Sequence, residues 1–108
     1  MPAVWIKPGE CGEESMVMVG KASMTKASIS VETTCPYIRA FIDALPEELD
    51  IGQELSAPIT ETTIYRLAQE HVCRNSCVTP AAILKALEVL GGVYLPATAH
   101  IEFVDGII

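Results

Sequence analysis

The spacing of apolar residues changes along this chain, and that change constrains the fold more than any other feature of the sequence. Residues 27–33 alternate between apolar or β-branched side chains and polar ones. Alternation with a period of two is typical of a β-strand with one buried and one solvated face. Residues 3–7 and 16–22 are also rich in strand-forming side chains. We therefore predict three strands in the first part of the chain, with a hairpin turn near residues 24–26.

From residue 36 onward, apolar side chains recur three and four residues apart, the spacing of an amphipathic helix. The first predicted helix begins at Pro36, whose fixed φ suits a first helical position, and it stops before Pro46. Another helix has Thr79 as its cap and Pro80 at its first position, and it ends at Gly91. Both helices carry their own start and stop signals.

A further helix lies between these two. Thr60 is a suitable N-cap, and Ile59 before it should pack on Ile64 as a hydrophobic staple. The apolar spacing predicts that this helix ends near Val72 or Cys73. Residues 46–58 lack a regular pattern, so we expect a connection that contains a short helical turn.

The last part of the chain returns to an alternating pattern. Ala99, Ile101 and Phe103 alternate with His100 and Glu102, which predicts a final strand that rejoins the sheet. The expected fold is a single α+β domain over residues 1–108. It has three N-terminal strands, three helices and one C-terminal strand, with the helices packed on one face of a mainly antiparallel sheet.

Composition narrows the partners and the compartment. The chain has 108 residues, half of them hydrophobic, so one core can form without help from a metal or a disulfide. A net charge of −7 repels phosphate backbones and anionic lipid headgroups, which argues against nucleic acid and membranes as partners. There is no apolar segment of signal-peptide or membrane-spanning length, so we expect a cytoplasmic protein.

The four cysteines are the side chains of this sequence best suited to metal binding or redox chemistry. In a reducing cytosol, cysteines indicate metal or redox chemistry more often than a disulfide framework. All four fall at predicted element boundaries rather than on an apolar stripe. Cys11 lies in a glycine-containing turn, Cys35 precedes the first helix, Cys73 follows the second and Cys77 precedes the third.

These positions favour a shared site. Helix N-termini stabilise anionic thiolates, the form that binds metals. Four thiolates suit either structural zinc or an iron–sulfur cluster, and the spacing does not decide between them, although a Cys35-Pro36 dipeptide leans toward iron–sulfur. His71 is a substitute ligand, or it complements the helix dipole. We predict a metal site made of Cys11, Cys35, Cys73 and Cys77.

Two other functions remain open at this point. Cys73 and Cys77 are close enough in sequence to act as a thiol redox pair beside a helix N-terminus. Alternatively, the thiols are buried and inert, and the protein is a noncatalytic interaction module for a protein partner, with the apolar end Ile107-Ile108 seeding a homodimer. Serine nucleophile elbows, phosphate-binding glycine loops and helical zinc-protease motifs are absent, so no reaction is predicted.

One pattern spans most of the chain: an early Cys11-Gly12, then Thr34-Cys35-Pro36 at a helix start, then Cys73 and Cys77 followed by Thr79-Pro80. This arrangement resembles small uncharacterised four-cysteine domains of bacteria and archaea. The resemblance implies no activity. It implies only that the four cysteines work together. The predicted metal or iron–sulfur site is what suggests an accessory or electron-transfer role.

Overall fold

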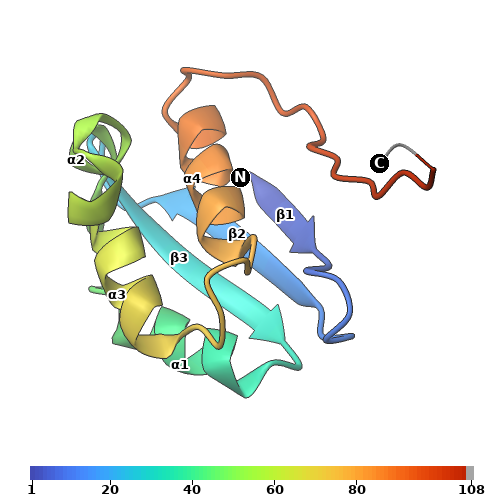
Figure 1. Cartoon of the computed structure of the whole chain (residues 1–108). Coiled ribbons are helices and arrows are strands. Elements are labelled where there is room, and N and C mark those ends of the chain that lie inside the picture. The colour runs from blue at the N-terminus through green and yellow to red at the C-terminus, as the bar shows by residue number, and fades with distance from the viewer. Residues whose placement is uncertain (107–108) are drawn as a thin grey trace.

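An antiparallel sheet of four strands forms one layer of the molecule, and helices cover one of its faces (Figure 1). The computed structural model describes residues 1–106. Each strand pairs with the next along the chain, so the order in the sheet follows the order in the sequence. The predicted α+β class is therefore confirmed. The strands are β1 (Ala3–Ile6), β2 (Ser15–Lys21), β3 (Lys26–Thr33) and β4 (Leu49–Asp50).

The two faces of the sheet differ as the alternation predicts. Val17 of β2 lies opposite Val31 of β3, and both are buried under the helices. Ser28 and Glu32 of β3 point to the other face and are exposed. The predicted hairpin turn lies between β2 and β3, where the chain reverses after Lys21.

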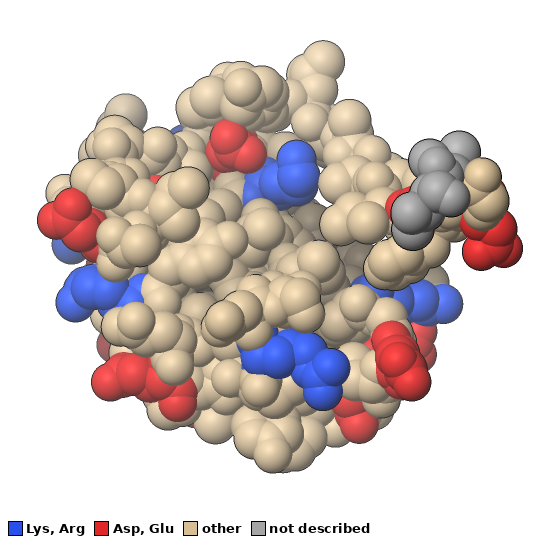
Figure 2. Space-filling view, viewed as in Figure 1, with Lys and Arg blue, Asp and Glu red and all other residues tan. Residues whose placement is uncertain are grey.

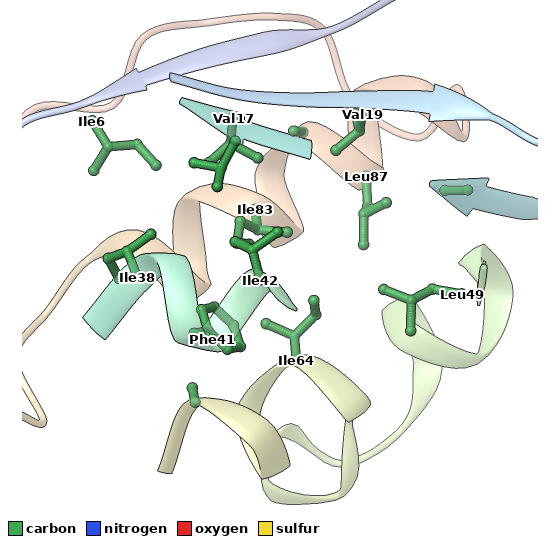
Figure 3. Packing of buried hydrophobic residues seen from close by; sticks show 14 of the residues in the cluster. Ile6, Val17, Val19, Ile38, Phe41, Ile42, Leu49, Ile64, Ile83 and Leu87 are labelled. Carbon is green, nitrogen blue, oxygen red and sulfur yellow. The ribbon is translucent and has the colours of Figure 1, made fainter. Parts of the chain in front are cut away.

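Helices supply the second layer. Their bounds are α1 (Pro36–Ala44), α2 (Ile51–Ser56), α3 (Thr63–His71) and α4 (Thr79–Leu90), with a 3₁₀ turn η1 (Ile59–Glu61). Helix α4 packs on β1 and β2, while α1 packs on β3 and on α3. Figure 3 shows Phe41, Ile64, Ile83 and Leu87 meeting Val17 between the layers, and all five are fully buried. The predicted starts of α1 and α4 are confirmed to within one residue.

The start of α3 differs from the prediction. Its N-cap is Thr62 rather than Thr60, and the Thr62 hydroxyl accepts a hydrogen bond from the Tyr65 N–H at 3.1 Å. Ile59 is 68% exposed, so the predicted staple onto Ile64 does not form. Pattern reading placed the cap two residues early because the 3₁₀ turn η1 intervenes between the connection and the helix.

The predicted C-terminal strand is wrong. Residues 99–103 form no strand, and every residue from 91 to 106 is exposed. The fourth strand is instead β4, which falls within the connection expected at residues 46–58 and pairs with β3. Alternation describes the two faces of a strand but does not specify which neighbour it pairs with. Ile107-Ile108, predicted to seed a dimer, lie outside the described residues.

Candidate metal centre

All four cysteines line one cavity of about 500 Å³, which we call the cysteine cavity. It lies where several elements begin or end. Its wall includes Ser15 at the start of β2, Cys35 before α1, Cys73 after α3 and Cys77 before α4. The fourth thiol, Cys11, comes from the connection between β1 and β2. In Figure 1 these ends meet on the lower side of the domain, so the antiparallel topology gathers distant parts of the sequence there.

Cys35 is the most buried of the four thiols, with 9% of its surface exposed. Its backbone N–H donates to the Thr33 hydroxyl at 3.0 Å, and that hydroxyl donates in turn to the carbonyl oxygen of Glu14 at 3.1 Å. The Ser15 hydroxyl lies 2.7 Å from the Thr33 hydroxyl, close enough for a further hydrogen bond. This network joins the start of β2 to the end of β3 and fixes the backbone that carries Cys35.

The Cys35 thiol is not used to cap α1. The first N–H groups of a helix lack intrahelical partners and carry partial positive charge. Tyr37 and Ile38, both in the first turn of α1, line the cysteine cavity. Cys35 thus stands beside backbone N–H groups that are free to face a ligand in the cavity.

Cys73 and Cys77 bracket the loop between α3 and α4. The Cys77 N–H donates to the carbonyl oxygen of Arg74 at 3.2 Å, which closes a tight turn. The Cys77 thiol donates to the hydroxyl of Thr79 at 3.3 Å, and Thr79 is fully buried at the start of α4. Cys73 and Arg74 are exposed but still line the cavity.

Cys11 is carried by the loop from β1 to β2. Gly9 and Gly12 adopt positive φ angles of 134° and 73°, conformations that favour glycine. The Gly12 N–H donates to the Gly9 carbonyl at 3.1 Å, which turns the chain around the exposed Cys11. The positive φ angles therefore explain why glycines occupy these two positions, and the turn that they form places Cys11 at the cavity.

The thiols surround a space rather than a point. In the described part of the chain, no three Cys, His, Asp or Glu side chains gather closely enough to hold a single metal ion. A tetrahedral zinc ion, with Zn–S bonds of about 2.3 Å, would bring its sulfur ligands to about 3.8 Å from one another. The four cysteines are free thiols that line one cavity, and no three of them converge in this way.

Some residues at the cavity were not anticipated. Glu13, which no sequence pattern singled out, is half-buried and lines the cavity together with Tyr37. Its position two residues after Cys11 was the available signal. His71, the substitute ligand, lies in the last turn of α3 and is not among the lining residues, a position that suits the helix-dipole alternative.

Charges of both signs are mixed on the face of the molecule that Figure 2 shows. On the face shown in Figure 2, Lys and Arg stand in separate places with Asp and Glu between them. Arg74 and Glu13 bring one charge of each sign to the cysteine cavity. None of the helices in residues 1–106 has the length and apolar character required to cross a membrane.

Comparison with known proteins places the chain in a family. No curated protein matches it, and no solved structure does. One family model, described as a family of unknown function (DUF6951), matches residues 3–103. The match spans all four cysteines and nearly the whole described chain, in agreement with the resemblance to small domains of unknown activity. The chain therefore belongs to the DUF6951 family.

Proposed function

We propose that this protein binds an iron–sulfur cluster through Cys11, Cys35, Cys73 and Cys77. The observation that carries the proposal is that these thiols, from four separate element boundaries, line one cavity. Thiols that only filled the core would have no reason to share a wall. Four cysteine thiolates are the usual ligand set of such clusters.

The width of the cavity favours a cluster over a single zinc ion. A zinc ion draws its four sulfurs to a common point. A cluster presents its iron atoms at separate corners, so each thiolate binds a different iron and the sulfurs stand farther apart. A cavity of about 500 Å³ with no three ligands near one point fits the larger group better.

The surroundings would stabilise thiolates and tune a bound cluster. The N-terminal ends of α1 and α4, which carry partial positive charge, lie beside Cys35 and Cys77 and would suit an anionic cluster. Once Cys77 is deprotonated, the Thr79 hydroxyl can donate to its sulfur, and hydrogen bonds to sulfur raise the reduction potential of a cluster. Cys11 and Cys73 are exposed, so the site would be open to a protein partner. We propose an accessory or electron-transfer role in the cytoplasm.

The test is anaerobic purification followed by reconstitution with ferrous iron and sulfide. We expect about four iron atoms and four sulfide ions per chain. The loaded protein should also absorb visible light, as thiolate-bound iron does. Replacement of any of the four cysteines, for example Cys73→Ser, should reduce the iron content. The control Ser76→Ala changes an exposed residue of the same loop and should leave it unchanged.

Two results would contradict the proposal. One is stoichiometric zinc with no uptake of iron, which would indicate that the loops close around a single ion. The other is a folded protein that binds neither metal. Rapid alkylation of Cys73 or Cys77 alone in such a metal-free protein would favour the thiol redox alternative.

A further inference from the structure

The C-terminal tail, residues 93–106, leaves the body of the domain after α4 (Figures 1 and 2). Ile101 is 79% exposed and Phe103 99%. His100 Nε2 and Glu102 Oε1 lie 3.7 Å apart, so these two polar side chains share one side of the chain. Side chains two residues apart in an extended segment point the same way, which assigns Ile101 and Phe103 to the other side. The tail thus has one polar and one apolar side, as a strand does, but it pairs with no strand in residues 1–106.

The sheet offers a free edge to such a strand. The Val19 N–H donates to the Pro2 carbonyl at 3.0 Å, and the register pairs Val4 with Val17. In an antiparallel pair the backbone groups of successive residues point alternately toward and away from the partner. The N–H and C=O groups of Ala3, Trp5 and Lys7 therefore point away from β2. Within residues 1–106, no strand pairs with that edge.

We infer that residues 99–103 of one chain add as a strand to the free edge of β1 in a second copy, reciprocally, so that the protein forms a two-fold dimer. Strand addition satisfies unpaired edge groups and buries the alternate side chains of the added strand. Ile101 and Phe103 would continue the helix-covered face that holds Val4 and Ile6. Glu102 would then lie on the open face on the same side as Lys7, whose ammonium already lies 3.5 Å from Glu14 Oε1, so the proposal rests on the backbone pairing and the apolar side chains.

A second copy is the occupant that the structure favours. In this structure the tail does not pair with β1 of its own chain. The β1 edge and the apolar side of the tail are therefore both exposed in one molecule. Exchange between two copies covers both β1 edges and one side of both tails at once, and the two-fold symmetry closes the assembly at two chains. The family match extends through Phe103, so the segment is part of the shared domain rather than an appended extension.

The test measures the association state of the full chain by sedimentation across a dilution series, together with amide hydrogen exchange. We expect a dimer in which the N–H groups of Ala3, Trp5 and Lys7 exchange slowly. Trp5 is the one tryptophan of the chain and is 64% exposed, so its emission should move to shorter wavelength as the dimer forms. A mixed sample of labelled and unlabelled chains should show contacts between Phe103 of one chain and β1 of the other.

Matched tail variants locate the interface. Ile101→Asp and Phe103→Asp place a charge on the apolar side and should weaken the dimer by about tenfold or more. His100→Asp adds a charge on the opposite side and should leave the dimer largely intact. All three positions are exposed, so the fold should be retained, as circular dichroism would verify.

Three outcomes would overturn the inference. A monomer with fast exchange at β1 would mean that the edge stays free. A monomer with slow exchange there would mean that the tail docks on its own sheet. A dimer unaffected by both apolar-side variants would use a different surface. The result does not depend on whether the cysteine cavity binds a cluster.

Discussion

Glu54 shows how one buried side chain can connect two elements. It lies in α2, is only 2% exposed, and its carboxylate accepts hydrogen bonds from the N–H groups of Thr63 and Ile64, each at 2.9 Å. These N–H groups belong to the first turn of α3 and have no intrahelical partners. The carboxylate thus satisfies two backbone donors, and its negative charge interacts favourably with the positive end of the α3 dipole.

Glu54→Gln should destabilise the protein by about 1–3 kcal/mol, because an amide keeps one acceptor oxygen but turns an NH₂ group toward a backbone N–H. Urea denaturation measures the difference in the free energy of unfolding. Glu61→Gln removes the same charge at an exposed site near the start of α3 and serves as the control. Equal stability of the two variants would contradict the capping role of Glu54.

Among the elements, those with strong local signals were predicted well. Pro36 and Pro80 fix the starts of α1 and α4, and the alternation of β3 matches its burial. The end strand failed for a physical reason: a segment with alternating side chains still needs a neighbour, and the sequence does not say whether that neighbour is in the same molecule. β4, with two residues, is too short to have a period.

For the site, the prediction that the cysteines fall at element boundaries is confirmed, and those boundaries lie around one cavity. Local patterns could show this because a glycine or proline stands close to Cys11, Cys35 and Cys77, and the apolar spacing of α3 stops just before Cys73. The distances between the sulfur atoms depend on how β1, α1 and α3 pack, which no local pattern contains. The place of Glu13 in the cavity wall could not be predicted for the same reason.

The start of α3 gives an element-level prediction with a built-in control. Thr62→Ala removes the cap that accepts from the Tyr65 N–H and should cost about 1 kcal/mol. Thr60→Ala changes an exposed residue of η1 and should alter the free energy of unfolding by less than about 0.5 kcal/mol. Urea denaturation of both variants compares the two positions. A larger loss of stability in Thr60→Ala than in Thr62→Ala would indicate that Thr60 is the cap.

For the whole molecule, the core is largely independent of the cysteine cavity. The buried cluster is hydrocarbon from the sheet and from all four helices, and Cys35 is its one thiol. Cys77 packs at its margin, while Cys11 and Cys73 are exposed. A domain built this way has enough apolar burial to fold before any metal binds, in contrast to small domains that depend on a metal for their core.

We therefore expect the protein to remain folded after chelation under anaerobic reducing conditions, with a cooperative thermal transition followed by circular dichroism. Loading with iron and sulfide should raise Tm, because a group that binds only the folded state stabilises it, by about 2.7 kcal/mol at a hundredfold excess over Kd. For a domain of this size that gain corresponds to a shift of about 10 °C or more.

Cys11→Ser should match the chelated parent in stability, since Cys11 is exposed, yet lose much of the gain on loading. Loss of the cooperative transition on chelation would show instead that the bound group is part of the folding core.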